Sequence, residues 1–148
     1  MKDNKETYLP QTGHEVFKPM VLTTDEREKL ALVQSIELFT WLRDNPGKSK
    51  RDFEGSFNVL AMFCFCPLCE CADVSTGKSV FGINCHLCPM YCGWPMLSGK
   101  KTRECTDRGS VYMRWEGRKG SFDAQTLIDA FTLRLEEYNT KGDVHNDE

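Results

Sequence analysis

The sequence lacks the short motifs that mark the common enzyme classes. It has no His-Glu-x-x-His zinc helix, no Walker phosphate-binding loop and no Gly-x-Ser-x-Gly nucleophile turn. The zinc-deaminase pattern is also incomplete, because His14 is not followed by Glu at the second position after it. We therefore expect no catalytic residues and no enzyme activity.

Long apolar runs are missing as well. The longest is Val59–Phe65, far short of the roughly 18 residues of a membrane-spanning helix. Residues 1–13 are polar and of mixed charge, without the apolar core of a secretory signal peptide. These absences predict a cytoplasmic protein that has no membrane partner.

A general excess of positive charge is absent, since the formal net charge is −3. The charge is unevenly spread, however. Residues 46–119 carry eleven Lys or Arg and seven Asp or Glu, whereas residues 120–148 carry two and seven. Four zinc-bound thiolates would add about −2 to the middle segment. The chain as a whole therefore does not look like a nucleic-acid binder.

Cysteine is the residue type that defines the chain. All eight cysteines lie within residues 64–105, and two Cys-x-x-Cys pairs, Cys66/Cys69 and Cys85/Cys88, are separated by fifteen residues. Two such pairs are typical of a closed, tetrahedral zinc site. In a reducing compartment, clustered cysteines are better explained as metal thiolates than as disulfides. We predict one structural zinc ion.

The ligand assignment stays open, because eight cysteines compete for four positions. The two pairs form the leading set, and Cys105 is the alternative fourth ligand in place of Cys85. Cys92 is a further candidate, and a two-metal site would use most of the eight. Cys64 and Cys71 are otherwise interpreted as small buried hydrophobes. An iron–sulfur cluster is the less favoured cofactor.

Two amphipathic helices are expected to flank this segment. Residues 23–43 begin with a capping box between Thr23 and Glu26, and residues 121–139 have the clearer helical period. The predicted buried face of the first helix is Leu32, Val33, Ile36, Phe39 and Leu42. That of the second is Ala124, Leu127, Ile128, Phe131 and Leu135.

The predicted fold is therefore a small α+β domain that zinc stabilises. It spans residues 23–139, with a zinc-ribbon-like or knuckle-like metal segment at 56–115. Residues 1–22 are expected to form an irregular arm, and residues 140–148 a disordered acidic tail.

Short strands are expected inside the metal segment. Residues 56–65 suit a buried strand or an extended entry, although a short buried helix fits the same pattern, and residues 79–84 suit a short strand. Residues 72–78 have the composition of a turn. Residues 111–115 fit either a strand or the start of a helix.

A basic and partly aromatic stretch covers residues 100–119. It is a possible surface for nucleic acid or for a protein partner, through phosphate contacts and base stacking in the first case. Its candidate residues are Lys100, Lys101, Arg103, Arg108, Tyr112, Arg114 and Trp115.

The order of these motifs carries a resemblance. A helix with Trp41-Leu42, the two cysteine pairs, a lone Cys105, and Tyr112-x-x-Trp115 before a final helix follow one another within residues 30–135. In this order the chain resembles an uncharacterised family of small cysteine-rich zinc-binding proteins of large tailed bacteriophages. The resemblance implies Cys105 as a ligand candidate and an accessory protein that acts on a host component. It supplies no activity.

Departures from that pattern leave the ligands open, namely the extra Cys64, Cys71 and Cys92 and a longer acidic tail. The favoured function is a structural-zinc binding module that binds and modulates, or inhibits, a host protein in the host cytoplasm. The alternative is nucleic-acid binding through residues 100–119. A larger assembly with a purely structural role is a third possibility.

Overall fold

The computed structural model describes residues 24–76 and 85–146. Within these ranges the chain forms four α-helices, several single-turn 3-10 helices and one two-stranded antiparallel sheet. This confirms the α+β class. The layout of the helices differs from the prediction, however, because two of them lie inside the segment that was expected to hold strands.

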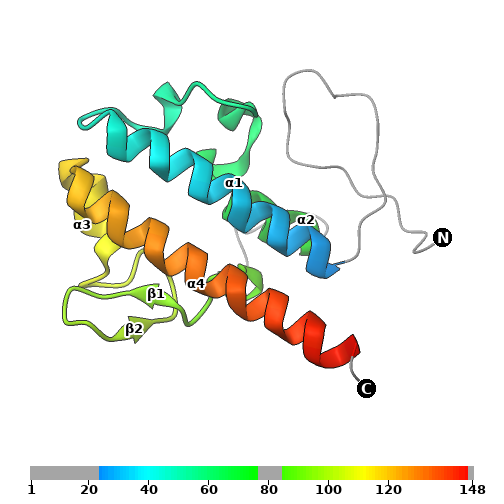
Figure 1. Ribbon diagram of the computed structural model, residues 1–148. Helices are drawn as coiled ribbons and strands as arrows, with labels where there is room; N and C mark the ends of the chain where they lie inside the picture. Colours follow the sequence, from blue (N-terminus) through cyan, green and yellow to red (C-terminus); the bar gives the residue numbers. More distant parts are fainter. Residues whose placement is uncertain (1–23, 77–84, 147–148) are drawn as a thin grey trace.

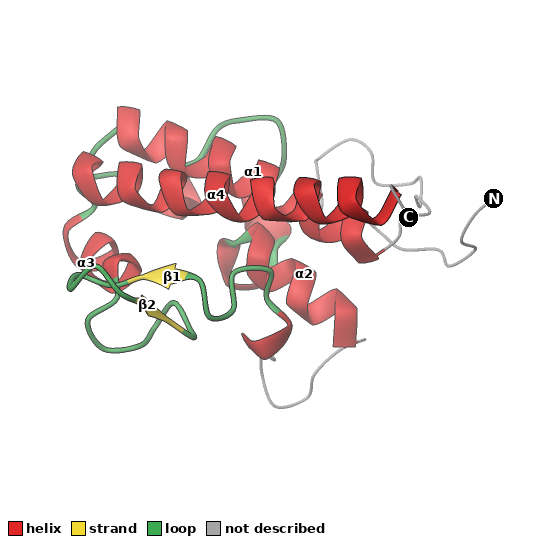
Figure 2. Cartoon of the chain, turned by 60° about the horizontal axis from the view of Figure 1, so that its bottom comes forward, coloured by secondary structure: helices red, strands yellow, loops and turns green. Residues whose placement is uncertain are grey.

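The two long helices form the frame. Helix α1 (Thr24–Asp44) and helix α4 (Ser121–Asn146) lie side by side and run in opposite directions (Figure 1). Helix α2, helix α3 and the small sheet gather on one side of this pair (Figure 2). The cysteine-rich segment is therefore held against a helical platform built from the two ends of the domain.

Helix α1 buries a slightly different face from the predicted one. Leu32, Phe39 and Leu42 are at most 2% exposed, as expected, and Leu38 is fully buried with them. Val33 was expected on the same face but is 48% exposed. One step along a helix turns a side chain by roughly 100°, so a stripe that includes Leu32 and Leu38 leaves Val33 in solvent.

Helix α4 packs along α1 through the predicted stripe. Ala124, Leu127, Ile128 and Phe131 are buried. At its start, the Ser121 hydroxyl donates a 2.6 Å hydrogen bond to the carbonyl of Arg43, which ties the beginning of α4 to the end of α1. The helix continues to Asn146, through most of the segment that was predicted to be a disordered tail.

Residues 56–65 do not form the expected strand. They contain two single-turn 3-10 helices, η2 (Val59–Ala61) and η3 (Phe63–Phe65). Cys64 and Phe65 have φ angles of 56° and 53°. Two successive left-handed residues cannot continue a strand, so the chain turns sharply here and enters the first cysteine pair.

The predicted turn at residues 72–78 is largely helical. Helix α2 (Pro67–Thr76) begins with proline, whose missing amide hydrogen is tolerated at the first helical position. Leu68, Cys71 and Ala72 follow helical spacing and are all buried. Helix α2 packs against α1.

The sheet is a short hairpin. Strand β1 (Trp94–Pro95) pairs with strand β2 (Lys101–Thr102), with Trp94 opposite Thr102. The Met96 amide donates to the Lys100 carbonyl at 2.9 Å and closes the turn. The hairpin packs against α4 through β1.

Residues 111–115, which fit either a strand or the start of a helix, are helical. Helix α3 (Val111–Arg118) starts where the Ser110 hydroxyl accepts a 3.1 Å hydrogen bond from the Met113 amide, which is a side-chain N-cap. Val111 and Trp115, one turn apart, are buried.

An aromatic cluster joins these elements. The Phe39 ring lies edge-on to Trp115, at 5.1 Å between centroids, and to Phe131, at 5.6 Å. Trp94 reaches the same Phe131 ring at 5.7 Å. Because each edge-to-face pair adds about 0.5–1.5 kcal/mol beyond area burial, this cluster fixes α1, α3, α4 and the hairpin to one another.

Some expectations fall outside the described residues. These are the arm at 1–22 with His14, the capping residue Thr23, and the strand at 79–84. Within the described residues, no helix combines the length and the apolar character needed to cross a membrane.

Candidate metal centre

Six of the eight cysteines line one cavity of about 190 Å³. Phe39 of α1 and Phe131 of α4 close the cavity on the side of the long helices. The predicted leading ligands and the alternative fourth ligand all lie on this cavity, and one further cysteine joins them. The six are Cys64, Cys66, Cys69, Cys85, Cys88 and Cys105.

The start of α2 brings three of these thiols together. Cys66 directly precedes Pro67, the first helical residue, and Cys69 lies one turn into the helix. The left-handed turn at Cys64 directs its side chain to the same place. The sulfurs of Cys64 and Cys66 both hydrogen-bond with the Cys69 thiol.

These contacts separate the three pKa values. The pKa of Cys64 and the pKa of Cys66 both fall to about 6, first because each sulfur accepts a hydrogen bond from Cys69, and further because Lys50 is near. The pKa of Cys69 rises, because its thiol donates to both neighbours and is buried. These shifts favour thiolate sulfur, the form that binds metals, at Cys64 and Cys66 over Cys69.

The other side of the cavity holds neutral thiols. Burial raises the pKa of Cys88 well above its usual value and that of Cys105 to about 12. The pKa of Cys85 is also raised, first by burial and then by the charge of Glu104. A divalent cation in the cavity would reverse these shifts, since a thiol that coordinates a metal loses its proton.

A braced loop presents Cys105. Its carbonyl accepts a 2.6 Å hydrogen bond from the Ser110 hydroxyl. The Asp107 carboxylate accepts from the Thr102 hydroxyl at 2.6 Å and from the Glu104 amide at 3.0 Å. Cys105 is thus held by the hairpin on one side and by the cap of α3 on the other.

Lys50 was not anticipated at this site. It is only 9% exposed, and it lines the cavity. Its Nζ donates to the Tyr112 hydroxyl at 2.6 Å and to the Cys64 carbonyl at 3.2 Å. A buried cation offsets the charge of thiolates, and a four-thiolate zinc site carries about −2. In the sequence, Lys50 is indistinguishable from Lys48 within the same polar connector.

The thiols surround the cavity without closing on one point. Among the described residues, no group of three or more His, Cys, Asp or Glu side chains could hold a metal ion in its present positions. The cavity is also more than ten times the ~10–15 Å³ that one water molecule needs. The donor chemistry therefore suits zinc, but metal binding requires the thiols to move inward.

Cys71 and Cys92 do not line the cavity. Cys71 is buried, as predicted for a small hydrophobe, and its sulfur lies 3.9 Å from the Arg27 carbonyl. Cys92 is exposed, with a φ of 67°. Cys64 was interpreted from the sequence as a buried hydrophobe, and it is instead exposed at the cavity rim. All eight cysteines are free thiols.

The basic and aromatic stretch divides into two groups. Lys100, Lys101, Arg103 and Arg108 are exposed. The predicted surface is wrong for Trp115, which is fully buried in the aromatic cluster.

The remaining two residues of that stretch have partners inside the domain. The Tyr112 hydroxyl accepts a hydrogen bond from the Lys50 ammonium. The Arg114 guanidinium makes a two-pronged ion pair with Asp123, with distances of 2.8–3.1 Å, and links α3 to α4. The exposed basic groups of this stretch are thus the lysine and arginine side chains of the hairpin and its following loop, together with Arg118 of α3.

No protein-family model, curated protein or solved structure matches this chain. The bacteriophage resemblance, drawn from the order of motifs alone, thus stays a prediction.

Proposed function

We propose that this chain is a binding module stabilised by one structural zinc ion, and that its partner is a protein. The observation that carries the proposal is the single cavity lined by six cysteines. These cysteines come from three stretches of sequence, so the cavity is a product of the whole fold. A zinc ion there would tie η3 and α2 to the hairpin loop, and its binding energy would stabilise the folded state.

We assign Cys66, Cys69, Cys88 and Cys105 as the ligands. Cys66 belongs to the buried core, and the other three pack against it. Cys85, the fourth member of the sequence-based set, is not part of that core and neither is Cys64. A structural zinc ion has four protein ligands and no open position, and the four deepest thiols exclude water best.

A protein partner is favoured over nucleic acid. The aromatic rings that would stack on bases are turned inward, since Trp94 and Trp115 are at most 4% exposed. The net charge of −3 also opposes a phosphate backbone. A closed site of four thiolates leaves no zinc-bound water for catalysis, which supports a binding role over an enzyme.

The bacteriophage resemblance extends the proposal. An accessory protein of this kind would act in the cytoplasm of the host cell, where reducing conditions keep the thiols free for metal. Its partner would be a host protein that it modulates or inhibits.

Metal analysis of the purified full chain tests the zinc claim. We expect one zinc per chain, a colourless sample that excludes an iron–sulfur cluster, and a large fall in thermal stability after chelation. Cys66→Ser should lose the metal and unfold the middle segment. Cys92→Ser, at an exposed cysteine outside the cavity, should keep both the metal and the folded middle segment. Native-like melting of Cys66→Ser without zinc would overturn the proposal.

Affinity purification from a cell extract treated with nuclease tests the partner class. A protein that remains bound after nuclease treatment supports a protein partner. Loss of all bound material on nuclease treatment, together with a salt-dependent gel shift, would instead establish nucleic-acid binding.

A further inference from the structure

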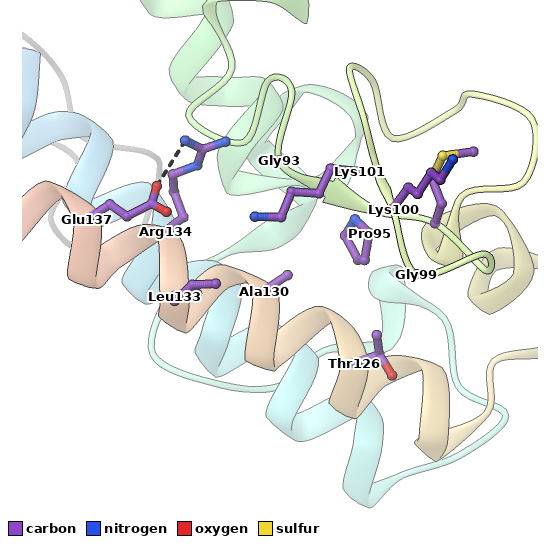
Figure 3. Close-up of a pocket in the computed structure, with 11 residues that line it drawn as sticks. Gly93, Pro95, Gly99, Lys100, Lys101, Thr126, Ala130, Leu133, Arg134 and Glu137 are labelled. Atoms are coloured by element: carbon purple, nitrogen blue, oxygen red, sulfur yellow. Dashed lines mark hydrogen bonds and ion pairs between the residues drawn. The ribbon is translucent and has the colours of Figure 1, made fainter.

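A groove of about 270 Å³ runs between α4 and the β1–β2 hairpin. It shares no lining residue with the cysteine cavity. In Figure 3, Ala130 and Leu133 rise from α4 on one side, and Pro95 and Lys101 extend from the hairpin on the other. The groove is therefore a separate surface of the same domain.

Both walls of the groove are fixed. On the hairpin, the Gly99 amide donates to the Met96 carbonyl at 2.9 Å, in a turn that needs the φ of 93° of Gly99. On α4, the Arg134 guanidinium donates to the Tyr91 carbonyl at 3.1 Å. It lies so close to Gly93 that a Cβ there would clash with its Nη2. The groove is thus formed before any partner binds.

The rim of the groove is positively charged. Lys100, Lys101 and Arg134 contribute three positive charges and Glu137 one negative charge, a net of +2. Arg134 shares its charge with Glu137, at 3.2 Å. Within the described residues, neither lysine forms an ion pair. Figure 3 shows the Lys101 side chain reaching across toward the Arg134 end of the groove.

The floor of the groove is apolar. Ala130 and Leu133 supply it from α4, and Pro95 and Met96 from the hairpin. The Leu133 side chain is 48% exposed, and removing apolar surface from water is favourable. A partner that covers this floor would therefore bind more tightly.

We propose that this groove binds an acidic segment of the partner protein, with carboxylates against Lys100 and Lys101 and one apolar side chain over Ala130 and Leu133. The inference rests on the proposed function, because it names the chemistry of that partner. The carboxylates match the net charge of the rim, and the apolar side chain matches the floor. Such complementarity gives specificity at a preformed site.

The size and surroundings of the groove favour this occupant. Sites for drug-sized molecules usually measure about 300–1,000 Å³, so 270 Å³ suits a few side chains better than a whole small ligand. A single-stranded nucleic acid would find no exposed ring to stack on among the residues that line the groove.

Chemical-shift mapping on the zinc-loaded, ¹⁵N-labelled full chain tests the proposal. Three probes are titrated separately: a capped peptide of alternating Leu and Glu, the same peptide with Lys in place of Glu, and an oligo-dT single strand. We expect the Leu–Glu peptide alone to shift amides of residues 93–101 and 126–137, with saturation weakened by added salt.

Substitutions in the groove test whether the Leu–Glu peptide binds there. Lys100→Glu with Lys101→Glu should weaken the Leu–Glu peptide roughly tenfold, about 1.4 kcal/mol. Leu133→Ser should weaken it as well, and as an exposed residue it leaves the fold intact. The matched control, Lys48→Glu with Arg118→Glu, makes the same charge change at two exposed residues outside the groove and should alter the affinity less than about twofold.

Any of three results would overturn the proposal for the groove. The Leu–Lys peptide binds as tightly as the Leu–Glu peptide, the two lysine substitutions leave the affinity unchanged, or the chemical-shift changes are confined to other surfaces. Preferential binding of oligo-dT would assign the surface to nucleic acid instead. Metal analysis of the same sample keeps the two claims apart. If a chain without zinc still binds the Leu–Glu peptide at the groove, only the claim of a structural zinc ion is contradicted. If a zinc-loaded chain does not bind the peptide, only the claim about the groove is contradicted.

Discussion

The Lys50 ammonium donates a 2.6 Å hydrogen bond to the Tyr112 hydroxyl, and it also lies over the Tyr112 ring, 5.0 Å from the centroid. The contact joins the connector after α1 to helix α3. It places a buried cation on the wall of the cysteine cavity. Positive charge there favours thiolates, whether or not a metal ion is bound.

Lys50→Met should destabilise the fold. The substitution leaves the Tyr112 hydroxyl and the Cys64 carbonyl without their donor, and an unsatisfied buried polar group costs about 1–3 kcal/mol. Urea unfolding of the zinc-loaded protein measures this loss. Lys48→Met, at an exposed lysine of the same connector, is the control and should stay within about 0.5 kcal/mol of wild type. If Lys50→Met and Lys48→Met are equally stable, Lys50 does not stabilise the site.

The Asp52 carboxylate should make the stability of the wild-type chain depend on pH, and Asp52→Asn should remove that dependence. The Asp52 carboxylate accepts from the Ser49 amide at 2.9 Å and from the Ser49 hydroxyl at 3.1 Å, and these bonds lower its pKa below 3.8. The ionised form therefore stabilises the turn that carries Lys50 at pH values above 3.8. This stabilisation is lost as the pH falls through the lowered pKa.

We expect the melting temperature of Asp52→Asn to lie below that of wild type at pH 7, with the gap closing in acid. Thermal melts at a series of pH values measure it. Glu54→Gln, at an exposed neighbour, should show no such gap. A difference that stays constant down to strongly acidic pH would contradict the role of the carboxylate.

Cys105→Ser should weaken metal binding more than Cys85→Ser. Cys105 packs against the core and its loop is braced by Ser110, whereas Cys85 is outside the core cluster. Since even residues that only support ligands typically contribute 10–100-fold to metal affinity, the loss at Cys105 should be at least about tenfold. Competition between the protein and a chromogenic zinc chelator measures both variants, and the reverse order would restore Cys85 as the fourth ligand.

Much of the frame follows from sequence patterns. The apolar period of residues 121–139 predicts the buried face of α4 because most of that face packs along one neighbour, α1. The two cysteine pairs predict one shared site for Cys66, Cys69, Cys85 and Cys88, and all four line one cavity, but their sulfurs do not close on one point. A local pattern thus predicts which residues lie near one another, and their use as metal ligands stays a prediction.

Other features depend on the tertiary structure. Leu68, Cys71 and Ala72 form a helical stripe, but residues 72–78 were interpreted as a turn and helix α2 was missed. The left-handed turn at Cys64 follows no residue preference. Trp115 belongs to a basic stretch, yet it packs edge-on against Phe39 of the distant helix α1, which in turn packs against Phe131 of α4. Such outcomes are decided by partners far away in the sequence.

X-ray absorption at the zinc edge of the purified chain tests the central claim most directly. The account predicts one zinc per chain with four sulfur ligands at about 2.3 Å, unchanged in Cys92→Ser and altered in Cys105→Ser. A protein that binds no zinc, or a zinc shell built mainly from nitrogen and oxygen, would contradict it.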